Sequence, residues 1–223
     1  MSFKNKFKMT SIALASAMAM GAMTMPTVAS ADVSYNAAVG SMYLWRGLDA
    51  SKGPTISGGI NYSHDSGAYA GAWASSGLNG TGASTSAADG YELDLFVGYS
   101  GKVSGFGYDI SYWDIDYPQV TGANGKSINE LSLGLTYADF SVSYTKNTKS
   151  GSKYQYITAG YTFGKFGIKY GMSDNGSDDY SHIDLSFAAS DKVSFTASKL
   201  SDASGGTANP EEMLIAVTYS LPI

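Results

Sequence analysis

Alternating apolar and polar residues form the dominant pattern after the first thirty positions of the chain. In the stretch 129–144, NELSLGLTYADFSVSY, apolar residues occupy every second position on both sides of Ala138-Asp139. A period of two is typical of a strand that buries or shields one apolar face. The intervening residues are mostly small and polar, which suits contact with water. The stretch therefore predicts a β-hairpin, and the same unit recurs to the end of the chain.

The pattern predicts twelve strands, separated by connections that alternate between short and long. The expected strands are 33–46, 54–64, 68–77, 90–101, 104–114, 127–137, 139–147, 153–164, 165–173, 180–189, 192–200 and 211–221. Short periplasmic turns and longer external loops are typical of outer-membrane barrels, and an even strand number leaves both termini on the periplasmic side. We therefore expect an all-β fold: a transmembrane, antiparallel, up-and-down β-barrel of about twelve strands, formed by residues 32–223. The facing of residues in the first three strands stays open, because neither parity there is clearly polar.

The N-terminal residues 1–31 have the three parts of a secretory signal peptide. Lys4, Lys6 and Lys8 precede an apolar run from Thr10 to Met20, and Ala29-Ser30-Ala31 fits the small-x-small cleavage rule. The apolar run is shorter than the roughly 20 residues that a membrane-spanning helix needs. The sequence therefore predicts export and cleavage after Ala31.

Composition and charge narrow the class further. Cleavage removes three of 14 basic residues and none of 19 acidic ones, so the remaining 11 against 19 leave a net charge of −8. This balance argues against a nucleic-acid partner. The chain has no Cys, which excludes disulfides and cysteine metal sites. No later stretch is long and apolar enough for a spanning helix, so membrane insertion requires a closed barrel, and we expect it in the cell outer membrane.

Charged residues collect on the parity opposite the apolar face, where they would line the lumen. These candidate pore-lining residues are Arg46, at the external end of the first strand, with Glu92, Asp94, Asp109, Glu130, Lys169, His182, Asp184 and Glu212. One interpretation is an acidic, cation-attracting pore, because six acids face two bases in this set. The other is a plug of internal salt bridges that pairs Arg46 and Lys169 with acids. Twelve strands predict a narrow lumen in either case.

Two further motifs suggest chemistry only weakly. His182 and Asp184 face the same way and could imitate a hydrolase triad with a nearby serine, although outer-membrane lipid hydrolases present such sites toward the bilayer. The loop Asp174–Asp179 carries oxygen ligands but lacks the spacing of a calcium loop, so a hydrated loop is the favoured interpretation. Residues 78–89 are rich in Gly, Ser and Thr and predict a flexible loop. We therefore predict no catalytic residue, metal or cofactor.

The last strand alternates apolar residues from Met213 through Tyr219 to the C-terminus. This ending resembles the signal by which the barrel-assembly machinery recognises outer-membrane proteins, although Ile223 stands where that signal has an aromatic residue. An apolar edge strand of this kind would promote aggregation in a soluble protein. We expect the assembly machinery to be a partner through this strand.

The region from Tyr43 to Ser75 carries a family resemblance. The motif Tyr43–Gly47, Pro54, Gly58-Gly59, Tyr62 and the run Gly67–Ser75 resemble the TorF-type porin family, a proteobacterial outer-membrane family of uncharacterised function. The resemblance implies an outer-membrane barrel with a pore. It supplies neither a substrate nor catalytic residues.

These observations predict a porin-like outer-membrane channel that passes small polar, cation-biased solutes by passive diffusion. Its expected partners are outer-membrane lipid, the assembly machinery and the solute or ion, while the sequence leaves the oligomeric state open. The alternatives are a closed structural or adhesive barrel with ligand-binding loops and, with less support, a membrane-embedded lipid hydrolase. Under the favoured prediction, the protein is not an enzyme.

Overall fold

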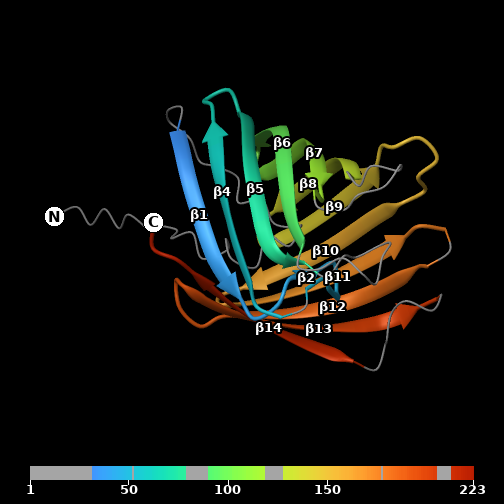
Figure 1. Cartoon of the computed structure of the whole chain (residues 1–223). Coiled ribbons are helices and arrows are strands. Elements are labelled where there is room, and N and C mark those ends of the chain that lie inside the picture. Colours follow the sequence, from blue (N-terminus) through green and yellow to red (C-terminus); the bar gives the residue numbers. More distant parts are fainter. Residues whose placement is uncertain (1–31, 52, 79–89, 119–127, 177, 205–211) are drawn as a thin grey trace.

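Figure 1 shows a computed structural model in which all regular elements are strands; it describes residues 32–51, 53–78, 90–118, 128–176, 178–204 and 212–223. Within these residues no helix is long and apolar enough to cross a membrane. The strands are β1 (Asp32–Gly40), β2 (Leu44–Trp45), β3 (Leu48–Asp49), β4 (Thr55–Ser63), β5 (Ala68–Leu78), β6 (Gly90–Val103), β7 (Phe106–Asp116), β8 (Ile128–Tyr137), β9 (Phe140–Asn147), β10 (Gln155–Phe163), β11 (Phe166–Asp174), β12 (Tyr180–Ala188), β13 (Val193–Ala203) and β14 (Met213–Ser220).

Twelve of these strands close into one antiparallel barrel, as the sequence predicted. Each strand from β4 to β14 pairs with its neighbours in chain order, and β1 pairs with β4 on one side and β14 on the other. The β1–β4 register covers nine residue pairs, from Asp32↔Ser63 to Gly40↔Thr55. The closing β1–β14 register covers three, from Ala38↔Ser220 to Gly40↔Thr218. Closure leaves no long unpaired edge of the kind that an open sheet exposes.

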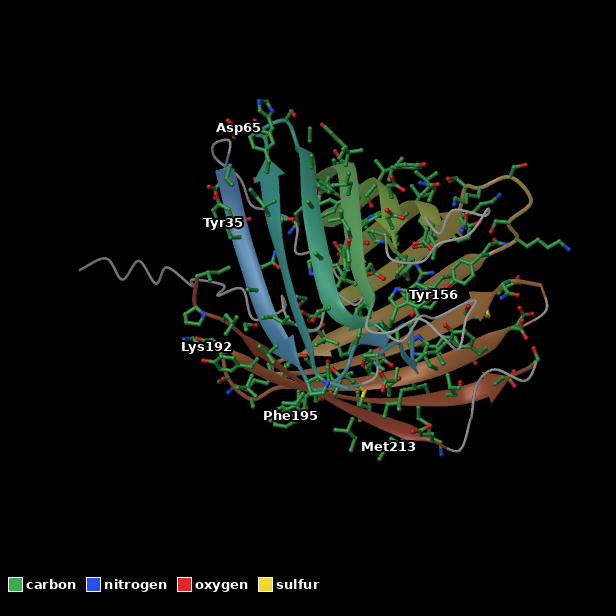
Figure 2. All side chains as sticks on the ribbon, in the orientation of Figure 1. Tyr35, Asp65, Tyr156, Lys192, Phe195 and Met213 are labelled. Carbon is green, nitrogen blue, oxygen red and sulfur yellow. The ribbon has the colours of Figure 1, made fainter. Side chains whose placement is uncertain are left out.

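The outward face of the wall is apolar on strand after strand. On β6, Leu93, Leu95 and Val97 are 39%, 54% and 56% exposed, while their neighbours Glu92 and Asp94 are buried. Figure 2 shows the same division, with Phe195 and Met213 pointing out of the barrel and Tyr156 lying within it. This face has the apolar character that a lipid bilayer requires of a barrel.

Aromatic rings form a belt at the end of the barrel where the turns are short. Phe106 stacks on Tyr137 with 4.3 Å between ring centroids, and Phe166 stacks on Phe187 at 4.9 Å. Aromatic belts of this kind sit at the membrane–water interface of outer-membrane barrels. The tight turn between β8 and β9 places Ala138 at φ 50°, a conformation that suits a two-residue hairpin connection.

The structure shows which residues of β5 face inward, a point that the sequence leaves open. On β5, Trp73 and Ser75 are buried within the barrel. The alternate positions of the same strand, which carry alanines, therefore belong to the outward face. Small outward residues and a large inward ring explain why neither parity of this strand looks polar.

One prediction is wrong, and it concerns the first connection. The expected first strand 33–46 ends at Gly40, and residues 47–51 of the expected external loop 47–53 fold into the lumen instead. In Figure 1 this segment leaves the wall after β1 and lies among the barrel strands beside β2. Strands β2 and β3 pair Trp45 with Leu48, so Arg46 and Gly47, at φ 50° and 86°, form the two-residue turn between them.

Candidate functional site: the barrel lumen

The inward segment, residues 41–51, is named the lumenal hairpin here, and its own hydrogen bonds hold its shape. The Ala50 amide donates to the Tyr43 carbonyl at 2.8 Å, and the Tyr43 amide donates to Ser51 Oγ at 2.8 Å. Ser51 Oγ in turn donates to Asp49 Oδ1 at 2.7 Å. The hairpin is therefore an ordered element inside the barrel, and it positions Tyr43, Trp45 and Arg46.

Arg46 lies buried inside the barrel rather than at the external end of a strand. Its Nη2 donates to Glu130 Oε2 of β8 at 2.6 Å, and both side chains are almost completely buried. A guanidinium is protonated at any physiological pH, so this is a charge-assisted contact, and it links the hairpin to the wall.

A second acid group lies against the hairpin near Tyr43. The Tyr43 hydroxyl donates to Glu92 Oε1 at 2.7 Å, and Asp94 lies close enough to interact electrostatically with Glu92 and Glu130. A phenol is protonated at neutral pH, so the Tyr43 hydroxyl is the donor in this bond. The Tyr43 ring packs on Trp73 of β5 with centroids 5.8 Å apart.

Lys169, His182 and Asp184 form a separate network on β11 and β12. Asp184 accepts from Lys169 Nζ at 2.9 Å and from Ser198 Oγ at 2.7 Å, and it bonds His182 Nδ1 at 2.8 Å. The other ring nitrogen, His182 Nε2, bonds the Tyr156 hydroxyl at 2.7 Å. The serine thus contacts the carboxylate instead of the imidazole, which differs from the Ser–His–Asp order of a hydrolase triad.

Two of the predicted lumen residues lie outside these groups. Asp109 on β7 is half-buried and accepts a hydrogen bond from the Tyr69 hydroxyl at 2.6 Å. Glu212 is exposed and precedes β14, so it does not join the buried acids. The structure therefore brings Arg46, Glu92, Asp94 and Glu130 together, and it gathers Lys169, His182 and Asp184 into the second network.

Two cavities lie on opposite sides of the Arg46–Glu130 pair. The inner cavity, of about 260 Å³, is lined by Arg46, Lys169 and Asp184 and reaches Asp191 in the short turn before β13. The outer cavity, of about 270 Å³, is lined by Trp45, Glu130 and Tyr154 and reaches the longer connections between β9 and β10 and between β11 and β12. Among the described residues the two linings share no member. The lumenal hairpin and its partners on the wall therefore form the partition between them.

The closed partition leaves some buried polar atoms unsatisfied. Trp73 Nε1, Asp94 Oδ1 and Glu130 Oε1 are buried and have no hydrogen-bond partner among the described residues. A buried polar atom without a partner costs roughly 1–3 kcal/mol relative to its hydrated state. These atoms therefore favour arrangements in which water or a solute reaches them.

Two carboxylates near the β11–β12 connection, Asp174 and Asp179, accept hydrogen bonds from backbone amides. The amides of Asn175 and Gly176 donate to Asp179 Oδ1 at 2.9 and 3.2 Å, and the Gly176 amide also lies 3.0 Å from Asp174 Oδ1. No group of three or more His, Cys, Asp or Glu side chains that could hold a metal ion occurs among the residues described. The expected flexible loop 78–89 lies, apart from its first residue, outside the described residues.

Sequence reasoning missed the aromatic part of this site. Trp45, Tyr154 and Tyr156 surround the Arg46 guanidinium, yet none of them was among the predicted lumen residues. A signal was present, because Tyr154 and Tyr156 lie on the parity opposite Ile157, where small polar residues are expected. Large rings on a lumenal parity indicate that the lumen is filled at that level.

The fold and lumen define the class of the protein as a closed β-barrel of the outer-membrane type with an internal partition. The chain belongs to Gcw_chp, a family of bacterial proteins of unknown function, whose sequence profile matches residues 26–213. No curated protein matches the chain in sequence.

Solved structures share the fold at low sequence identity. The chain is similar to the KdgM porin, with 14% identity, a TM-score of 0.51 and coverage of 85% of this chain and all of that one. It is also similar to the outer membrane phospholipase A from Escherichia coli, with 12% identity, a TM-score of 0.44 and 95% coverage of both chains. The similarity to the KdgM porin is a similarity of the barrel fold alone.

Proposed function

We propose that this protein is an outer-membrane channel that passes small polar solutes by passive diffusion and favours cations. The observation that carries the proposal is the pair of cavities on the two sides of one hairpin inside a closed barrel. Displacing the lumenal hairpin would join the cavities into one path. The proposal also draws on the porin-like fold and on the resemblance of the first third of the chain to the TorF-type porins.

The charge of the lumen supports a preference for cations. Five acids, Glu92, Asp94, Asp109, Glu130 and Asp184, face Arg46 and Lys169, which gives the lumen a formal charge of −3 when every acid is counted as ionised and His182 as neutral. A narrow lumen with low-dielectric walls concentrates such a field and raises the local concentration of counter-ions. Cations should therefore enter more readily than anions.

The second candidate is a closed structural or adhesive barrel whose loops bind a ligand. The bonds of Tyr43 to Glu92 and of Arg46 to Glu130 favour it, because they fasten the hairpin to the wall. A permanent plug would keep both bonds under all conditions. A hairpin that moves would release them when the channel opens.

The proposal also covers where the protein is located and how it reaches the outer membrane. We infer export by residues 1–31, insertion into outer-membrane lipid by the apolar outward face, and recognition of β14 by the barrel-assembly machinery. A role as a lipid hydrolase receives no support from the His182 network, in which the serine bonds the carboxylate. The protein is therefore proposed to act without catalysis.

Single-channel recording in a planar bilayer tests the channel. We expect conductance with a reversal potential that indicates cation preference, and a stronger preference at low salt, where the Debye length reaches about 30 Å at 0.01 M. Replacing Glu92 with Gln and Asp94 with Asn together should move the reversal potential toward zero. The matched control is Asp139→Asn in an exposed turn, which should leave it unchanged.

Two outcomes would contradict the proposal. Anion preference, or a reversal potential that ignores the double substitution, would exclude the acidic lumen as the selectivity element. No conductance in the wild type, together with none in Arg46→Ala, would support the closed structural barrel instead.

A further inference from the structure

The Arg46 guanidinium lies in a cage of three aromatic rings. Its Cζ is 4.6 Å from the ring centroid of Trp45, 4.9 Å from that of Tyr154 and 4.7 Å from that of Tyr156. Cations within about 6 Å of a ring centroid are attracted by the electrostatic field of the π-system, and the attraction grows when the site is dry. Arg46 and Tyr156 are each only 1% exposed, so the guanidinium and this ring are shielded from bulk solvent.

The cage also contains a carboxylate that can take a second donor. Glu130 Oε2 accepts from Arg46 Nη2 at 2.6 Å, while Oε1 is buried without a hydrogen-bond partner among the described residues. A carboxylate with two acceptor oxygens matches the parallel N–H groups of a guanidinium. The aromatic rings and the carboxylate together form a site for a planar organic cation.

The barrel wall supplies most of the cage, and the hairpin supplies its present occupant. Glu130 belongs to β8 and Tyr156 to β10, and Tyr154 is the residue before β10. Arg46 and Trp45 both belong to the lumenal hairpin. Moving the hairpin would remove the guanidinium and leave two rings and the carboxylate on the wall. Arg46 therefore occupies the cage as a ligand would, tethered through its own backbone.

The cage also lies where a solute would have to pass. Arg46 lines the inner cavity, while Trp45, Glu130 and Tyr154 line the outer one. A solute that crosses from one cavity to the other meets the carboxylate and the rings on its way. The site that holds the hairpin closed is therefore also the site that a permeating cation would contact.

We propose that the wall residues of the cage, Tyr154, Tyr156 and Glu130, recognise guanidinium-type organic cations, and that Arg46 is a tethered competitor which such a solute displaces to open the lumen. The inference rests on the proposed channel function, since it names the class of solute and the way it gains passage. A purely structural Arg46–Glu130 salt bridge would have the same short contact, but it would not bind a free guanidinium after Arg46 is removed.

Binding of methylguanidinium to the full mature chain, refolded in detergent micelles and measured by titration calorimetry, tests the cage without requiring conduction. Arg46→Ala should bind with a dissociation constant of about 1–10 mM, as expected for a dry aromatic and carboxylate site. The wild type should bind at least roughly tenfold more weakly, because a tethered group has an effective concentration in the millimolar range or above. Urea, which has the same planar shape without the charge, should not bind either protein.

Control variants separate the cage from charge in general. Adding Glu130→Gln to Arg46→Ala should abolish methylguanidinium binding, whereas Lys169→Ala, which removes the other lumenal cation, should behave as the wild type. If Arg46→Ala does not refold, Arg46→Gln retains the side-chain volume and should give the same result. Absence of binding in the refolded Arg46 variant, or equal binding after Glu130→Gln, would overturn the inference.

The outcome for the cage is distinguishable from that for the channel. Methylguanidinium binding without any conductance would retain the cage and reject the channel. Conductance without methylguanidinium binding would retain the channel and reject guanidinium-type cations as its solutes.

Discussion

At the scale of single residues, the close approach of Gly47 to His182 determines whether the lumenal hairpin can pack against the barrel wall. A Cβ added at Gly47 would lie 2.5 Å from His182 Cγ and 2.7 Å from its Cβ. His182 is fully buried and held on both sides by Tyr156 and Asp184, so it has no room to yield. Only glycine allows the turn to approach this closely.

Gly47→Ala should therefore displace the hairpin and open the lumen. Gly47 has φ 86°, so the substitution also costs roughly 1–2 kcal/mol of backbone strain. We expect higher single-channel conductance and longer openings than in the wild type, with the barrel still folded.

Gly53→Ala is the matched control for this prediction. Gly53 has φ 145° on the same connection, and a Cβ there would meet nothing within 4 Å. Strain without the clash should leave conductance at the wild-type level. Equal conductance of the two variants would show that the His182 contact does not hold the hairpin.

Individual lumen residues were predictable where strand alternation determines their direction. Glu92, Asp94 and Glu130 each alternate with outward apolar residues on their strands. All three are buried, as the parity of their positions indicates. Arg46 was placed wrongly, because its position depends on a turn that leaves the wall. Its partner Glu130 is 84 positions away, so only the closed fold could identify the pair.

At the scale of elements, the strands were predictable because the outward face of each one must be apolar. The expected strand 127–137 corresponds to β8, Ile128–Tyr137, and the expected strand 139–147 to β9, Phe140–Asn147. The first strand was extended too far, because alternation continues through Tyr43 and Trp45 beyond the end of β1 at Gly40. Aromatic residues that face a filled lumen give the same signal as residues that face lipid.

Strand β14 allows a test of the two faces of one element. Ile215 is 53% exposed on the outward face, whereas Thr218 lines the inner cavity. Ile215→Arg should destabilise the folded barrel by ~2–4 kcal/mol if it lies near the bilayer midplane. Thr218→Arg should cost less, because its side chain can extend into the inner cavity.

Urea unfolding in lipid vesicles measures the difference, and folded yield in the outer membrane measures its effect on assembly. Both variants place the same charge on the same strand, so recognition of β14 as a segment is affected similarly in each. Equal loss of stability from positions 215 and 218 would contradict the outward and inward assignment.

At the scale of the whole molecule, closure brings the first and last strands together. β1 begins at Asp32 and pairs with β14, and the Leu221 amide donates to the Ala37 carbonyl at 2.9 Å. An even number of strands places both ends at the short-turn side, which is periplasmic in outer-membrane barrels. Barrel closure was predictable from strand count and apolar parity, but the length of this seam depends on register that alternation does not specify.

The predicted cleavage after Ala31 falls immediately before Asp32, where β1 begins. Removing residues 1–31 there leaves the first wall strand intact while discarding Lys4, Lys6 and Lys8, whose charges belong to export. Protein extracted from outer membranes should therefore have the intact mass of residues 32–223. A closed barrel keeps its compact shape in mild detergent, so its band on a gel should also shift on boiling. A mass that retains the three lysines would refute the cleavage, and a water-soluble monomer in the periplasmic fraction would refute the membrane barrel.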